Sequence, residues 1–138
     1  MLVCTECWQL YENYTGVVRD GHPCPKMRCG GRIADIDELL LPAIILLNEK
    51  GYCTEYCCSG HFHQVRYGSA YIAFAEFVER KSFSSLPKGF KMDKDPSKKS
   101  VVIRREFKTK DQHKLHRQVT ESAIDVMNWA MGLKALPE

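Results

Sequence analysis

Four cysteines near the start of the chain have the spacing of a metal site. Cys4 and Cys7 form a Cys-x2-Cys pair, and Cys24 and Cys29 form a Cys-x4-Cys pair. Structural zinc is held in a tetrahedron by four sulfur or nitrogen ligands, and two short cysteine turns supply sulfurs two at a time. Residues 1–33 are therefore predicted to form a zinc ribbon. Its zinc would be structural, because four sulfurs leave no position open for a substrate. A disulfide framework and unrelated buried cysteines are the alternatives.

Two glycines, Gly30 and Gly31, directly follow the last of these cysteines. A cysteine turn has to curl its backbone amides around a thiolate, and glycine adopts positive φ without steric cost. We therefore expect both glycines to serve the second cysteine turn through positive φ.

A second group of chemically active side chains lies in a short segment that breaks a strand-like run. Its thiols, hydroxyl, glycine and histidines are Cys57, Cys58, Ser59, Gly60, His61 and His63. Successive amides in such a turn can form a concave anion site, to which Ser59 adds a hydroxyl and His61 a switchable charge. The alternatives are a second zinc held by Cys57 or Cys58 with the two histidines, a catalytic thiol, and buried thiols beside an ordinary turn.

Positive charge is concentrated in one part of the chain, although the formal net charge is only +3. Residues 1–79 carry six Lys/Arg against ten Asp/Glu, whereas residues 80–117 carry thirteen against four. A concentrated basic segment is typical of a protein with a phosphate-bearing partner. For the lysines around Pro87 and Pro96, a soluble loop is the preferred explanation. Phosphate contacts are predicted for His63, Arg66, Arg104 and Arg105, and base stacking for Tyr56, Tyr67 and Tyr71.

The elements that must position these residues follow from the apolar pattern. A helix is predicted from Asp35 or Asp37 to Gly51, with strands at 52–57, 62–67, 70–77 and 100–107 and a short strand at 90–92. Thr109 and Gln112 resemble a capping box for a last helix that ends near Gly132. Its core stripe is predicted to be Leu115, Val119, Ala123, Val126, Ala130 and Leu133. The fold class is α+β: an antiparallel sheet with two packed helices at 34–138, plus the N-terminal zinc ribbon.

The setting is predicted from the same sequence. Seven cysteines, an odd number, with no recognisable signal peptide predict a reducing cytoplasm. The longest apolar run, 39–47, contains Pro42 and is too short to span a membrane, so no membrane partner is expected.

The chain from about residue 37 to 134 resembles the wybutosine-synthesis methyltransferase family, whose tRNA-modifying proteins carry a Thr-x-x-x-Cys-Ser-Gly-Arg signature. Thr54, Cys58, Ser59 and Gly60 lie on that signature. Further similar segments are the helix with Leu41, Pro42, Leu46, Leu47 and Asn48, the strand 101–105, and the closing helix with Ala123 that ends at Gly132, Leu133 and Lys134. The Cys-Cys-Ser-Gly-His motif behind a ribbon is also similar to small uncharacterised proteins of bacteria and their phages.

Three functions are consistent with these features. The first is a zinc-ribbon protein that binds a nucleotide or nucleic acid through the Cys58–His61 turn and nearby basic residues. It could be phage-borne. The second, which the family resemblance implies, is an enzyme that uses S-adenosylmethionine to modify RNA. The third is a structural adaptor in which the ribbon and the long helix make a homo-oligomer.

Overall fold

The chain divides into two compact units, each with its own core. The computed structural model describes residues 1–11, 19–60, 68–93 and 99–137. The first unit, here the ribbon unit, is Met1–Glu38, and the second, the α+β unit, is Leu39–Glu138. The predicted boundary at residue 33 falls in the first position of a strand of the ribbon unit. No helix in the described part of the chain combines the length and apolar composition that crossing a membrane requires.

The ribbon unit is built on a three-stranded antiparallel sheet. Its strands are β1 (Leu2–Cys4), β2 (Leu10–Tyr11) and β3 (Ile33–Asp35), in the order β2-β1-β3. A buried cluster next to this sheet consists of Leu2, Cys4, Cys24 and Ile33. Two of these four residues are cysteines, so the thiols themselves form much of the interior. A core this small buries little apolar surface, and units of this size usually need a metal or disulfides for stability.

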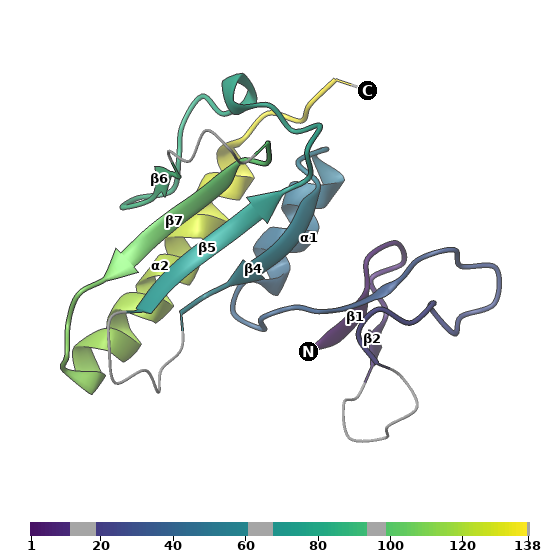
Figure 1. The fold of residues 1–138 in the computed structure, drawn as a ribbon, viewed down its shortest axis with the longest axis horizontal. Helices are drawn as coiled ribbons and strands as arrows, with labels where there is room; N and C mark the ends of the chain where they lie inside the picture. The colour runs from purple at the N-terminus through teal and green to yellow at the C-terminus, as the bar shows by residue number, and fades with distance from the viewer. Residues whose placement is uncertain (12–18, 61–67, 94–98, 138) are drawn as a thin grey trace. The chain divides into compact units, whose positions relative to one another are not determined.

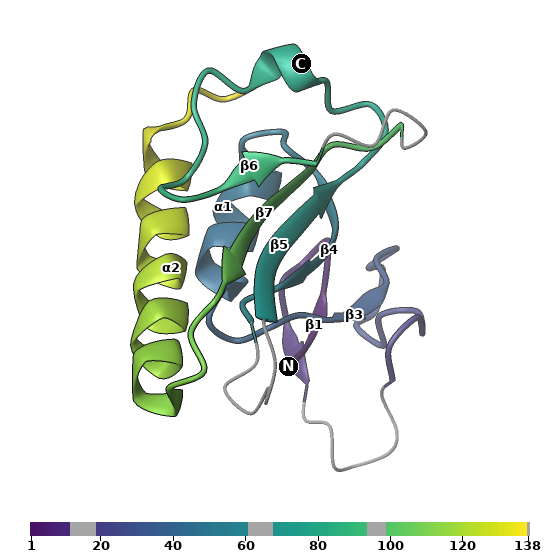
Figure 2. The same ribbon diagram turned by 60° about the vertical axis from the view of Figure 1, so that its left-hand side comes forward.

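The α+β unit contains one four-stranded antiparallel sheet and two helices. The elements are α1 (Leu41–Glu49), β4 (Thr54–Cys58), β5 (Gly68–Phe74), the 3-10 helix η2 (Arg80–Ser82), β6 (Lys91–Met92), β7 (Val102–Phe107) and α2 (Gln112–Gly132). The strand order is β4-β5-β7-β6. Both helices lie on one face of this sheet, as Figures 1 and 2 show from two directions. The predicted α+β class is confirmed.

The core of the α+β unit lies between the sheet and the helices. Ile72 of β5 and Ile103 of β7 are directly opposite each other in the register and fully buried. The predicted α2 stripe is confirmed, since every one of its residues is buried: Leu115, Val119, Ala123, Val126, Ala130 and Leu133. Each Å² of apolar surface that is removed from water stabilises the fold by about 25 cal/mol. The apolar layer between sheet and helices is therefore the main source of stability of this unit.

The two helices begin where the sequence pattern did not place them. The first starts at Leu41, after Leu40, which supplies no side-chain cap, and Pro42 stands in the first turn. The predicted start at Asp35 or Asp37 is wrong, because both residues belong to the ribbon unit. For α2 the cap is Asp111, not the Thr109–Gln112 box: its carboxylate accepts hydrogen bonds from the amides of the second and third residues of the helix.

The strands match the predicted ones with shifted ends. The strand predicted at 70–77 is observed as β5, which starts earlier, at Gly68, and stops at Phe74, where a turn follows in which Val78 N donates to Ala75 O. The strand predicted at 62–67 lies outside the described residues.

The end of α2 is connected to the end of α1 by one lysine. The Lys50 ammonium donates to the carbonyls of Ala130, Met131 and Leu133, at 2.8, 2.9 and 2.6 Å. The Lys50 carbonyl in turn accepts a hydrogen bond from the Leu136 amide at 2.8 Å. The last carbonyls of a helix have no partner within the helix, and a cation there also suits the negative end of the helix dipole. Lys50 therefore caps α2 from a position about 80 residues earlier in the chain.

Candidate metal centre and basic surface

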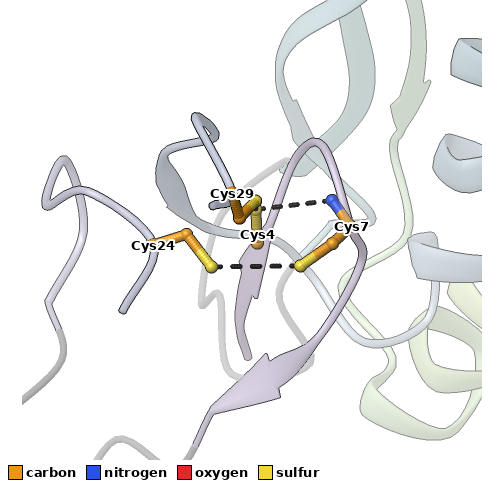
Figure 3. A group of neighbouring side chains, drawn as sticks. All are labelled: Cys4, Cys7, Cys24 and Cys29. Carbon is orange, nitrogen blue, oxygen red and sulfur yellow. Dashed lines mark hydrogen bonds between the residues drawn. The ribbon is translucent and has the colours of Figure 1, made fainter. Parts of the chain in front are cut away.

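The four predicted cysteines of the ribbon unit converge on one point, as Figure 3 shows. All four Sγ atoms lie within 4.8 Å of one another. The Sγ atoms of Cys4 and Cys29 are 3.6 Å apart, and those of Cys7 and Cys24 are 3.9 Å apart. A zinc ion with Zn–S bonds of about 2.3 Å holds sulfurs about 3.8 Å apart. A disulfide requires about 2.05 Å. The cluster therefore has the dimensions of a tetrahedral metal site, and the four thiols are not in disulfides.

Backbone amides are directed at the cluster from the first cysteine turn. The amides of Glu6 and Cys7 donate to Cys4 Sγ at 3.4 and 3.5 Å. Trp8, which directly follows this turn, has φ of 60°. Two amides of the first cysteine turn thus converge on the sulfur of Cys4.

The second cysteine turn obtains its positive φ from Arg28 (φ 66°), the residue before Cys29. The prediction that Gly30 and Gly31 have positive φ is wrong. Gly31 is required for a different reason: a Cβ atom there would lie 2.5 Å from Cys4 Sγ and 2.7 Å from Glu6 Cβ. The glycine allows the two cysteine turns to approach closely enough for their sulfurs to meet.

Tyr11 of β2 contacts the cluster through its hydroxyl, which lies 3.2 Å from Cys24 Sγ. This hydrogen bond lowers the pKa of the Cys24 thiol to about 7 and raises the pKa of the Tyr11 phenol to about 12. Tyr11 therefore remains a hydrogen-bond donor while Cys24 is half ionised near neutral pH. Sequence reasoning did not assign this role to Tyr11, because no spacing rule connects a tyrosine to a cysteine thirteen residues later.

We expect Tyr11→Phe to weaken zinc binding about tenfold, since partners that hydrogen-bond to metal ligands contribute about 10- to 100-fold to affinity. Without the hydroxyl, the Cys24 pKa returns toward its ordinary value, and protons compete better for the sulfur. The difference from the unmodified protein should therefore increase as pH falls from 8 to 6. Competition with a chromophoric zinc chelator at several pH values measures it. Tyr56→Phe, which removes a hydroxyl from the other unit, should have no effect.

The Cys58–Gly60 turn is buried in the α+β unit. Ser59 is 3% exposed, and its hydroxyl donates to the Gly60 carbonyl at 3.3 Å. The Gly60 amide donates to Cys58 Sγ at 3.5 Å. A Cβ atom on Gly60 would lie 2.8 Å from the Phe107 ring. In the described part of the turn, backbone and hydroxyl groups are thus engaged within the protein.

Three other predicted ligand residues of this segment, His61, His63 and Arg66, lie outside the described residues. A second zinc and an anion site at this turn stay predictions. A metal ion needs three or more His, Cys, Asp or Glu side chains close together. Among the described residues, the four ribbon cysteines form such a group.

Arg104 and Arg105 point to opposite faces of the sheet, as successive residues of a strand must. The Arg105 guanidinium lies 3.6 Å from the Asp125 carboxylate of α2 and 5.5 Å from the Phe107 ring centroid. Arg105 is therefore on the helix-covered face, and Arg104 is on the other, which we call the helix-free face. A ligand on one face of the sheet contacts only one of the two arginines.

Arg104 is held in place on the helix-free face by three neighbours. Its guanidinium donates to Ser69 Oγ at 3.0 Å and pairs with the Asp93 carboxylate at 3.3 Å. It also lies 5.0 Å from the centroid of the Tyr71 ring, directly across the strand pair.

Two shallow hollows flank Arg104 along β7. One, of about 610 Å³, is lined by Gly68, Ser69, Arg104, Glu106 and Lys108. The other, of about 410 Å³, is lined by Gly89, Lys91, Met92, Asp93, Arg104, Glu106 and Lys108. Sequence reasoning singled out Arg104 but treated Lys91 as part of a soluble loop, because Lys91 lies among the lysines around Pro87 and Pro96. Part of the basic segment thus lines concave surface.

Comparison with models of protein families, with curated proteins and with solved structures finds no match to this chain. The resemblance to the wybutosine-synthesis methyltransferase family therefore stays a prediction.

Proposed function

We propose that this protein is a zinc-ribbon protein that binds a nucleotide or nucleic acid through its basic α+β unit. The convergence of four sulfurs at tetrahedral spacing supports the zinc. An all-sulfur site favours zinc among the common divalent ions, because magnesium and calcium prefer oxygen ligands. The metal would be structural, since four protein ligands complete its coordination.

The observation that supports nucleotide or nucleic-acid binding is the pair of hollows around Arg104. Arginine suits phosphate and bases alike, because its planar guanidinium donates paired hydrogen bonds and stacks on flat rings. Lys91 and Lys108 are exposed beside it. These three cations belong to the segment 80–117, where Lys and Arg outnumber Asp and Glu thirteen to four. Methyl transfer to RNA and self-association through the long helix stay as alternative predictions.

Two measurements on the full-length protein test this proposal. Native mass spectrometry of protein purified without added metal should find one zinc per chain, and protein free of metal would contradict the zinc assignment. Fluorescence anisotropy at about 50 mM salt should detect binding to at least one of three labelled probes: a mononucleotide, a single strand and a duplex. Binding of a nucleic acid should weaken steeply with salt because of counterion release. If the protein binds none of the three probes, the nucleotide or nucleic-acid function is excluded.

A further inference from the structure

A row of three planar side chains crosses the helix-free face of the four-stranded sheet. The rings of Tyr56 (β4) and Tyr71 (β5) have centroids 6.1 Å apart and meet edge to face at 74°. The Arg104 guanidinium (β7) lies over the Tyr71 ring, 5.0 Å from its centroid. The row therefore spans three neighbouring strands. Among the described elements of the α+β unit, both helices lie on the opposite face (Figure 2).

The row is fixed at one end and open at the other. Arg104 is held by Ser69 and Asp93, so its guanidinium loses little freedom when a ligand binds. Tyr56 is 56% exposed, on a strand at the edge of the sheet. An aromatic ring of this size left half exposed offers a planar apolar surface for another flat group.

The hollows beside the row contain the polar groups that unpaired bases and their phosphates require. Lys108 is an exposed cation that lines both hollows, and Lys91 is an exposed cation that lines the smaller one, so both can meet phosphates. Glu106 accepts hydrogen bonds only, which suits the amino groups of cytosine or adenine and disfavours a phosphate at that point. Lys91 of β6 and Lys108, which directly follows β7, therefore offer positions for phosphates, and Glu106 of β7 offers a position for a base edge.

The geometry selects among nucleic acids. Aromatic rings and arginine planes stack on bases that are not already stacked in a duplex, and such stacking tolerates any sequence. A double helix offers phosphates to the lysines but no base faces to the tyrosines. The arrangement of rings with flanking cations is thus complementary to a flexible strand with unpaired bases.

We propose that the helix-free face binds single-stranded nucleic acid. Bases stack on Tyr56 and on the Tyr71–Arg104 pair, and phosphates lie near Lys91 and Lys108. This inference rests on the proposed function, which leaves open the number of strands and the side chains on which bases stack.

The test uses the full-length, zinc-loaded protein and labelled single strands of about 12 nucleotides, a typical length for such sites, as DNA and as RNA. We expect Tyr56→Ala to weaken binding about tenfold, because loss of one base stack costs roughly that factor. Tyr56→Phe keeps the ring and should bind as the unmodified protein does. Lys91→Met and Lys108→Met should each lower the slope of log affinity against log salt by about 0.7. Lys134→Met, which follows α2, controls for net charge.

The outcomes separate this inference from the proposed function. If single strands bind but Tyr56→Ala and the two lysine variants bind unchanged, the assigned face is wrong and the proposed function stands. If a duplex of the same sequence binds as tightly as the single strand, or only mononucleotides bind, single-strand recognition is wrong. If no probe binds, both are overturned. The lysine variants decide the matter even if Tyr56→Ala is unstable, because their side chains are exposed.

Discussion

Replacing Cys24 with serine is expected to unfold the ribbon unit and to leave the α+β unit folded. Cys24 supplies one of four converging sulfurs and is also part of the buried cluster with Leu2, Cys4 and Ile33. In small zinc domains the metal contributes about 10–16 kcal/mol of apparent binding free energy at neutral pH, which is the free energy that folds them. A hydroxyl does not replace a thiolate as a zinc ligand. Excess chelator should therefore have the same effect on the unmodified protein.

The two tryptophans of the chain report the two units separately. Trp8 lies beside the cluster, and Trp129 is buried in the α+β unit, where its indole N–H donates to the Ser85 carbonyl at 2.9 Å. In a ¹H–¹⁵N spectrum the Trp8 indole signal should move to its unfolded position in Cys24→Ser or with chelator, while the Trp129 signal stays. Cys53→Ser, at a cysteine outside the cluster, should change neither signal. A folded Trp8 signal in metal-free protein would contradict the structural role of zinc.

Gly60→Ala is expected to destabilise the α+β unit by about 3 kcal/mol. Gly60 has φ of +93°, a conformation that costs other residues about 1–2 kcal/mol. The added Cβ would also lie 2.8 Å from Phe107 Cε2 and 3.3 Å from Val119 Cγ2, and both of these residues are buried. Overpacking of a core contact adds about 1–3 kcal/mol. Urea unfolding followed by Trp129 fluorescence, in a Trp8→Phe background, measures the change.

Gly89→Ala is the matched control for the Phe107 contact. Gly89 has a similar φ of +80°, but its nearest neighbour would be the Arg105 side chain at 3.0 Å. That flexible side chain can move, so the substitution should cost about 1 kcal/mol, from φ alone. Equal losses at the two glycines would mean that the turn tolerates the extra atom. Glycine would then be needed at position 60 only for its positive φ, and not because the space beside Phe107 is tight.

The α2 helix shows where sequence patterns succeed. Its apolar residues recur every three or four positions, so the six predicted stripe residues from Leu115 to Leu133 are buried as expected, whereas the burial of Ser122 and Trp129 was not predicted. In α1 the run 39–47 is apolar on all sides, so the sequence could not show which face is buried. Its start was missed because Leu40 precedes the first turn without any side-chain cap.

The candidate sites show the same division. The cysteine spacing predicted four ligands, because both partners of each pair are close in sequence. The hydrogen bond between Tyr11 and Cys24 depends on the position of β2 next to the second cysteine turn. No local sequence pattern predicts that position. The assignment of Arg104 and Arg105 to opposite faces follows from strand alternation alone. Tyr71 and Arg104 are neighbours because β5 pairs with β7. The sequence alone does not predict which strands pair.

The contact between Lys50 and the end of α2 sets an order of events during synthesis on the ribosome. The four cysteines of the cluster all lie within the first 38 residues, so the sulfurs of the candidate metal site are complete as soon as that stretch emerges. Lys50 can form its hydrogen bonds to the end of α2 only after residues 130–133, about 80 positions later in the chain, have been synthesised. Until then α1 and the first strands of the sheet lack their covering helix. A nascent chain halted before residue 130 would therefore contain all four cysteines of the cluster and, in its second unit, a sheet without its covering helix, which is the kind of surface that chaperones bind.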